Sequence, residues 1–197
     1  MKNIFIINLL EHQDRWNLCQ QELKKINLPY TRFEAIKYNN GLSRQDREMG
    51  CKLSHYELIK KAKNEDMEYI TIFEDDIVIK DDFNEKIKLF DQYRDWVLFY
   101  LGGNTQYNRG NIPVDKNQFV VFAKYVKTTH AYCIHSSIYD ELLIMIESNK
   151  DATIDAIYYG GVQRKYKCYA FYPAIVTQRT GISYIQGKVR DYSEWIK

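Results

Sequence analysis

A run of apolar residues that ends in three consecutive carboxylates constrains this chain more than any other feature. Tyr69 to Phe73 is typical of a buried β-strand, Glu74-Asp75-Asp76 follows at once, and apolar residues resume at Ile77. Carboxylates packed so closely repel one another, and burial adds to the cost of their charge. A divalent cation with oxygen ligands is the usual way to hold them together. We therefore predict that the triplet lies at the carboxyl end of a core strand, where open α/β sheets bind ligands.

Strand and helix patterns alternate along the 197 residues, which is a length typical of one domain. Strands are predicted at residues 3–8, 30–36, 69–73, 96–101, 119–126, 132–135 and 168–172. Helices are predicted at residues 12–26, 52–62, 81–90 and 137–148, with one more capped near Thr153. The helix at 52–62 is expected to begin at Gly50-Cys51, after a separate short helix capped by Ser43. This alternation predicts an α/β domain with parallel strand pairing in its first half.

Composition and charge exclude several classes of protein. The net charge is only +2, and Lys and Arg are spread along the chain, which argues against a nucleic-acid partner. The four cysteines lie far apart, so we expect reduced thiols in a cytoplasmic protein and no zinc knuckle. The amino-terminal segment does not resemble a signal peptide, and no apolar run reaches the ~20 residues that cross a bilayer. Dinucleotide, Walker and His-Glu-x-x-His motifs are missing.

The carboxylate triplet suggests a metal site. Side chains two residues apart in a strand share one side, so Glu74 and Asp76 could reach one cation while Asp75 turns toward an arginine or a helix terminus. Manganese or magnesium carrying a diphosphate is the natural occupant. His130 is a candidate third ligand or a sugar-binding residue. The alternative is an acidic turn that merely precedes a helix N-terminus.

Two further segments are candidates for chemistry. Ser54 and His55 follow the expected helix start at Gly50, where a diphosphate or an acceptor could bind, although a helix histidine is often structural. Asp155 lies in the first turn of a predicted helix, either as a cap or as a general base that deprotonates an attacking hydroxyl.

With these residues identified, the chain resembles glycosyltransferase family 25, which includes bacterial lipooligosaccharide galactosyltransferases and the collagen galactosyltransferase domain. The matching segments are Ile6 to Leu9 with Arg15, Phe33 to Ala35, Glu48 to Cys51 with Leu53 to His55, Phe73 to Ile77, Leu101 to Gly103 and Ala131 to Ile134. Asp155, Tyr172-Pro173, Gln178 and Ser183 also fall in the expected order. The chain is shorter than expected of the family, and its acidic motif begins with Glu where many related enzymes have Asp.

The resemblance implies a GT-A type, Rossmann-like single domain at residues 1–197, with a mostly parallel central sheet flanked by helices. It assigns residues 1–103 to nucleotide-sugar binding and 104–197 to the acceptor side. It implies that manganese is held by the acidic motif, Glu74 and Asp76, with Asp76 as the first choice, and it strengthens the assignment of Asp155 as the base. His130, chosen from the residues alone, stays the third candidate metal ligand. The residues implied for donor binding are Asn8, Leu9, Arg15, Ser54, His55 and Asp75.

The predicted function is a metal-dependent inverting transfer of galactose or a related hexose from a UDP-sugar to a glycan or glycoconjugate such as lipooligosaccharide. Tyr107, Tyr132 and Tyr158 are the candidate sugar-lining aromatics. Two alternatives stay open: a non-catalytic carbohydrate- or partner-binding module on the same scaffold, and a magnesium-dependent hydrolase. The aromatic and basic tail, residues 180–197, either packs against the domain or contacts an anionic membrane at its inner face.

Overall fold

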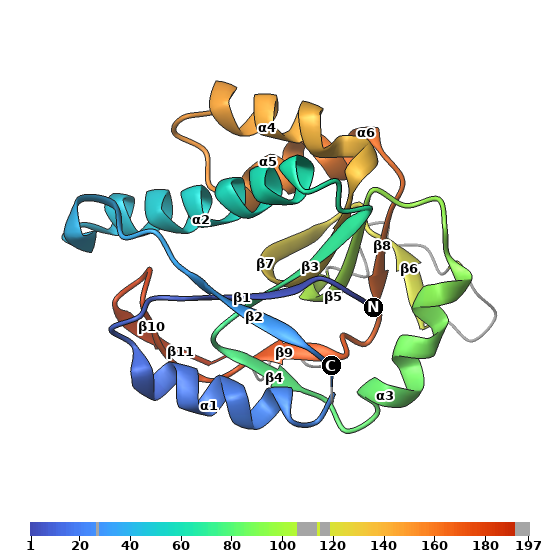
Figure 1. Cartoon of the computed structure of the whole chain (residues 1–197), viewed down its shortest axis with the longest axis horizontal. Helices are drawn as coiled ribbons and strands as arrows, with labels where there is room; N and C mark the ends of the chain where they lie inside the picture. Colours follow the sequence, from blue (N-terminus) through green and yellow to red (C-terminus); the bar gives the residue numbers. More distant parts are fainter. Residues whose placement is uncertain (27, 106–113, 115–118, 192–197) are drawn as a thin grey trace.

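A seven-stranded mixed sheet with helices on both faces forms the domain (Figure 1). The computed structural model describes residues 1–26, 28–105, 114 and 119–191. The strands of the main sheet are β1 (Ile4–Asn8), β2 (Tyr30–Glu34), β3 (Tyr69–Glu74), β5 (Leu98–Thr105), β6 (Val120–Phe122), β7 (Val126–His135) and β8 (Cys168–Phe171). Two small two-stranded sheets pair β4 (Ile77–Ile79) with β9 (Val176–Gln178), and β10 (Gly181–Ser183) with β11 (Lys188–Arg190).

The order of the main sheet is β2-β1-β3-β7-β5-β8-β6. β1 pairs in parallel with β2 and β3, and β5 pairs in parallel with β8, whereas β7 and β6 run antiparallel to their neighbours. Most strands therefore point the same way, and the predicted parallel pairing of the first half is confirmed. Because β7 lies between β3 and β5, the two predicted halves of the chain share one sheet.

Both faces of the sheet are covered, which explains why its central strands carry buried apolar residues on both sides. Along β1, Phe5 and Ile7 belong to the core beneath one face, while Ile4 and Ile6 belong to the core beneath the other. One face carries α2 (Arg44–Asn64), α4 (Tyr139–Ser148) and α5 (Ile154–Ile157), and the other carries α1 (Gln13–Leu23) and α3 (Phe83–Lys86) (Figure 1). The remaining helical segments are η1 (Tyr38–Gly41), η2 (Ile87–Gln92), η4 (Ser136–Ile138), η5 (Tyr158–Val162) and α6 (Gln163–Lys165).

The structure corrects the predicted break before Gly50, because α2 is one continuous helix. Ser43 caps it with a capping box: its hydroxyl accepts from the Asp46 amide, and the Asp46 carboxylate accepts from the Ser43 amide. Gly50 lies within the helix, where a Cβ would meet the carbonyl oxygen of Ile36 at 2.4 Å. The glycine therefore permits close helix packing and does not start a helix.

Two other predicted elements differ from the structure. The strand expected at 119–126 is divided between β6 and the start of β7, because the chain bends at Lys124 and Tyr125 between the two strands. The strand expected at 132–135 is the end of the longer β7. Among the described helices, none is both long and apolar enough to cross a bilayer. Tyr107 and the tail residues 192–197 lie outside the described residues.

Candidate functional site

A cavity of about 320 Å³ opens at the carboxyl ends of β1 and β3. The first half of α2 forms one wall, and the segment from Gln178 to Gln186 contributes another. Of the ten predicted site residues, all except His55 and His130 line it. Those eight are Asn8, Leu9, Arg15, Ser54, Glu74, Asp75, Asp76 and Asp155. The topology thus gathers residues from four distant parts of the sequence around one cavity.

Asp75 is engaged by protein partners on both oxygens. Its Oδ2 accepts a hydrogen bond of 2.6 Å from the Asn8 amide, and its Oδ1 accepts one of 2.9 Å from Arg15 Nε. Asn8 is itself held by Arg32, whose Nε donates to the Asn8 side-chain oxygen at 3.0 Å. Asp75 is 7% exposed and Asn8 is 1% exposed. As expected from the sequence, Asp75 turns toward an arginine, and it fixes the first strand to the acidic motif.

Asp76 has the opposite surroundings. Its Oδ1 is buried and lacks a hydrogen-bond partner among the described residues. Its Oδ2 lies 3.4 Å from the Gln178 amide nitrogen and 3.5 Å from Arg15. Burial and the negative charges of Glu74 and Asp75, only partly offset by Arg15, raise the pKa of the Asp76 carboxyl to about 7. A buried carboxylate oxygen without a hydrogen-bond partner requires a proton or a cation.

Gln178 on β9 approaches Asp76 with its side-chain amide nitrogen. Its Oε1 is also buried without a hydrogen-bond partner in the described part of the chain. Carboxylate and amide oxygens are the ligands that hard divalent cations prefer. The oxygens of Asp76 and Gln178 are therefore suited to the divalent cation that the sequence resemblance implies, and these two residues are among those that would hold it.

Glu74 faces a different set of groups. The Thr129 hydroxyl donates to its Oε1 at 3.2 Å, and the same oxygen lies 3.6 Å from Nε2 of His55. Burial opposes ionisation of Glu74, but His55, His130 and Thr129 together bring its pKa below the ordinary value. Thr128, which precedes Thr129, has a φ of 71°, an uncommon conformation for a β-branched residue. Groups from α2 and β7 thus favour the charged form of the carboxylate.

His130, the third predicted ligand, has protein groups beside both of its ring nitrogens. His130 is 3% exposed, with Nδ1 3.1 Å from the Thr128 hydroxyl and Nε2 3.4 Å from the Val176 carbonyl oxygen. Burial lowers its pKa. Any role of His130 at a cation therefore competes with these two contacts. Metal binding by the predicted trio stays a prediction.

Ser54 and His55 lie within α2 and not at a helix start. The Ser54 hydroxyl accepts from the Ile36 amide at 2.8 Å and donates to the Gly50 carbonyl at 2.7 Å, so both of its hydrogen bonds are made within the fold. His55 is fully buried, and its Nδ1 lies 2.8 Å from the Tyr132 hydroxyl. The backbone amides at this point belong to the helix, so the predicted diphosphate site at its N-terminus is not formed there.

The predicted sugar-lining tyrosines are corrected by the structure. Tyr132 and Tyr158 are fully buried in the core, and their hydroxyls lie 3.0 Å apart. Aromatic lining comes instead from Tyr38 and Tyr184, at the mouth of the cavity. The Tyr184 ring meets the His12 ring edge-on, with the two ring centroids 4.8 Å apart. In the sequence, the aromatic tail pointed only generally to Tyr184, and no pattern singled out Tyr38.

Asp155 lies in the first turn of α5 and lines the cavity. Its Oδ1 accepts a hydrogen bond of 2.6 Å from the Thr153 hydroxyl, and the residue is half-buried at the wall. Nearby, burial and the charges of Glu74 and Asp155 raise the pKa of the Cys51 thiol well above its ordinary value. From the sequence, this cysteine was expected only as a reduced thiol.

Comparison with known proteins decides the family. The family model described as glycosyltransferase family 25 (LPS biosynthesis protein) matches residues 1–45 and 38–158. The chain belongs to glycosyltransferase family 25. The resemblance found in the sequence is therefore confirmed, and the acidic motif lies inside the matched part.

Curated relatives of this family 25 member come from bacteria and vertebrates. A putative glycosyltransferase of Haemophilus influenzae is 33% identical over 101 residues, which are 43% of this chain and 36% of that protein. Procollagen galactosyltransferase 1-A of Xenopus laevis is 26% identical over 160 residues, 66% of this chain and 26% of that protein. The inactive glycosyltransferase 25 family member 3 of Mus musculus is 29% identical over 92 residues, 44% of this chain and 16% of that protein. The chain thus spans at most 36% of the length of these three relatives.

Solved structures confirm the fold of the family 25 domain. A glycosyltransferase involved in glycosylation of the major capsid of PBCV-1 has a TM-score of 0.58 at 11% identity, covering 94% of this chain and 96% of that chain. GlyE of Streptococcus pneumoniae TIGR4 has a TM-score of 0.56 at 8% identity, covering 98% of this chain and 59% of that chain. The GT-A type α/β fold predicted from the sequence is confirmed.

Proposed function

We propose that this protein is a metal-dependent glycosyltransferase that moves a hexose, galactose or a close relative, from a UDP-sugar to a hydroxyl of a glycan or glycoconjugate. Family membership supports sugar transfer. The names of relatives include a lipooligosaccharide biosynthesis protein and a procollagen galactosyltransferase, which supports a galactose-type donor and a glycan or glycoprotein acceptor. The observation that carries the proposal is Asp76, whose buried Oδ1 has no partner among the described residues and which lines a cavity large enough for a ligand.

The roles of the residues follow from their surroundings. Asp76 and Gln178 would hold a manganese or magnesium ion, with Glu74 as the further carboxylate. When bound, such a cation supplies positive charge that stabilises the departing diphosphate. Asp75 holds Asn8 and Arg15 in place, and the Arg15 guanidinium, which also approaches Asp76, adds positive charge at the same edge of the cavity.

Asp155 is the proposed general base. Its carboxylate lines the cavity from α5, so an acceptor hydroxyl bound there can transfer its proton to the carboxylate oxygen that does not accept from Thr153. The acceptor oxygen then attacks the anomeric carbon from the face opposite the diphosphate, and the configuration inverts. Tyr38 and Tyr184 offer ring faces to a sugar or a base at the cavity mouth.

The first experiment is calorimetric titration of UDP, with and without manganese, on the wild type and on Asp76→Asn. We expect binding that requires both the cation and the Asp76 carboxylate. Asp140→Asn is the matched control, because it makes the same change at an exposed carboxylate on α4 that pairs with Lys63. UDP binding to Asp76→Asn at wild-type affinity would remove Asp76 from the site.

The non-catalytic module is the second candidate, because two relatives carry names that describe them as inactive family members. A screen of UDP-sugars against glycan acceptors, read by NMR of the new glycosidic bond, separates the two. Transfer with inverted anomeric configuration, lost in Asp155→Asn, supports the proposal. Glycan binding without turnover supports the module, and sugar released only to water supports a hydrolase.

A further inference from the structure

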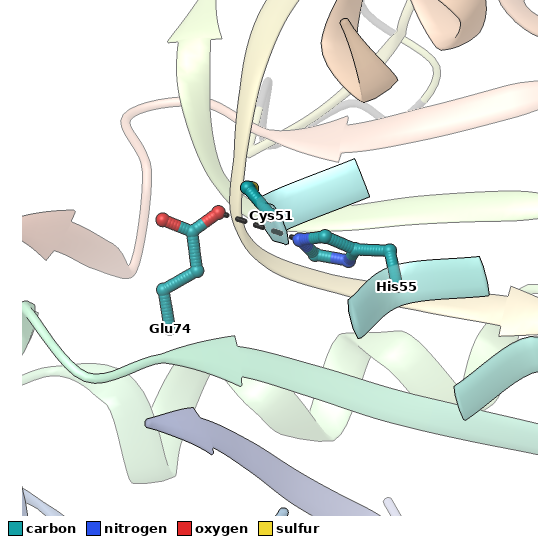
Figure 2. A group of neighbouring side chains, drawn as sticks. All are labelled: Cys51, His55 and Glu74. Carbon is teal, nitrogen blue, oxygen red and sulfur yellow. Dashed lines mark ion pairs between the residues drawn. The ribbon is translucent and has the colours of Figure 1, made fainter. Parts of the chain in front are cut away.

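Three side chains with metal-binding atoms lie close together at the cavity wall and just behind it. Cys51 and His55 are four residues apart on α2 and therefore lie on the same side of the helix, facing Glu74 at the end of β3 (Figure 2). One ligand atom from each residue lies within 4.8 Å of the others. In Figure 2 the Glu74 carboxylate and the His55 ring point toward one another, with Cys51 beside them.

His55 supplies an independent observation, because one of its ring nitrogens faces this cluster without a hydrogen-bond partner among the described residues. The residue is fully buried, and its Nδ1 is occupied by the Tyr132 hydroxyl. Its Nε2 has no hydrogen-bond partner among the described residues, and it points at Glu74 Oε1 across 3.6 Å. That distance is too long for a hydrogen bond. In a tetrahedral site with metal–ligand bonds of about 2.0–2.2 Å, neighbouring nitrogen and oxygen ligands are separated by about 3.3–3.6 Å.

The surrounding hydrogen bonds suit a ligating histidine. With the proton on Nδ1, His55 donates to Tyr132, whose hydroxyl reaches Tyr158 at 3.0 Å, and the lone pair of Nε2 faces the carboxylate. Thr129 orients that carboxylate from β7. A metal-bound histidine commonly donates its other N–H to a fixed partner in this way. Two acceptors that face one another in a buried site need a proton or a cation between them.

We propose that Cys51, His55 and Glu74 bind a thiophilic divalent cation, for which zinc is the natural ion. Sulfur, nitrogen and carboxylate oxygen form a zinc-type ligand set, whereas manganese and magnesium prefer oxygen ligands alone. Cys51 and Glu74 also line the cavity, so a fourth ligand such as water would approach from it. The zinc site does not depend on the proposed function. If both hold, zinc draws Glu74 away from the cation at Asp76.

The test uses the full chain after treatment with a chelator. Cobalt is titrated as a spectroscopic substitute for zinc, because a thiolate ligand gives an intense near-ultraviolet charge-transfer band and tetrahedral cobalt gives strong visible bands. We expect one equivalent to bind with both features, and zinc to displace it. In Cys51→Ser the thiolate band is lost. Zinc affinity falls by at least about 100-fold in Cys51→Ser and His55→Gln, since even supporting residues commonly contribute 10–100-fold.

Two controls keep the result interpretable. Glu48→Gln changes a cavity-lining carboxylate one turn earlier on α2 and should leave the cobalt spectrum intact. Asp76→Asn should also keep the spectrum while losing manganese-dependent UDP binding, so failure of the proposed function and failure of the zinc site are distinguishable.

A second experiment tests the site without a substitution. Zinc should protect Cys51 of the wild type from alkylation, as mapped by mass spectrometry. A wild-type protein with no thiolate band, or a band that survives Cys51→Ser, would overturn the proposal.

Discussion

Asp75 and Asp76 are neighbours in the chain, yet their carboxylates have opposite surroundings. Asp75 accepts hydrogen bonds on both oxygens, from Asn8 and Arg15. Asp76 keeps one buried oxygen without a partner in the described structure, and its pKa is raised to about 7. The contrast separates two roles within one motif. The paired carboxylate ties the acidic motif to side chains of β1 and α1, and the unpaired one is left for a ligand that the protein does not itself supply.

The largest expected effect on stability comes from removing the Asp75 carboxylate, which is hydrogen-bonded on both oxygens. Asp75→Ala leaves Arg15 and Asn8 without their shared acceptor, and we expect the free energy of unfolding to fall by about 3–5 kcal/mol. Urea denaturation followed by circular dichroism measures it. Asp76→Asn is the comparison variant, and at pH 8 without metal it should be as stable as the wild type or more stable. Equal losses in the two variants would erase the distinction between the two carboxylates.

The Asp76 carboxyl predicts that stability changes with pH in the opposite direction to that expected for an ordinary ion-paired carboxylate. Because the pKa of Asp76 is raised in the folded state, the native protein binds more protons than the unfolded chain between about pH 4 and pH 7. The free energy of unfolding of the metal-free protein should therefore fall as pH rises through this window, by at most about 4 kcal/mol.

The difference between the pH profiles of the wild type and Asp76→Asn isolates this contribution, since other carboxylates titrate in both proteins. Saturating manganese should flatten the wild-type profile by replacing the proton. Superimposable profiles of the two metal-free proteins would show that the Asp76 carboxyl titrates normally.

The smallest expected effect on stability concerns Glu74, whose carboxylate is less fully hydrogen-bonded than that of Asp75 but more so than that of Asp76. Thr129→Val keeps the side-chain shape but removes the hydroxyl that donates to Glu74, and we expect a loss of about 1–2 kcal/mol. Thermal or urea unfolding detects it. Thr31→Val, the same change at an exposed position of β2, should alter stability by less than about 0.5 kcal/mol. A neutral Thr129→Val would mean that Glu74 draws no stabilisation from this hydrogen bond.

The sequence was sufficient for features set by local pattern. The apolar runs of β1 and β3 and the acid triplet placed the cavity edge correctly, because buried strands ending in carboxylates have few other solutions. The family resemblance added Asn8 and Arg15, which no local pattern would have linked to Asp75. Eight of the ten predicted residues consequently line one cavity.

The errors arose where a residue's environment depends on distant segments. Gly50 was interpreted as a helix start, but it serves the approach of α2 to the Ile36 carbonyl, a contact that sequence spacing does not reveal. Tyr132 was expected at a sugar site, yet the antiparallel insertion of β7 between β3 and β5 buries it. Gln178 resembled the family only by its order in the chain, and the approach of its side-chain amide to Asp76 became visible only through the pairing of β9 with β4.

The pairing of β4 with β9 also determines when the acidic motif can mature during synthesis. Ile77 is paired with Gln178 and Ile79 with Val176, while the Arg179 amide donates to the Asp76 carbonyl at 2.6 Å. Gln178 follows Asp76 by 102 residues. That whole stretch of chain must leave the ribosome before β9 can pair with β4. A nascent chain therefore carries its carboxylate triplet without the strand that holds it in place, and the proposed cation site is among the last parts of the domain to form.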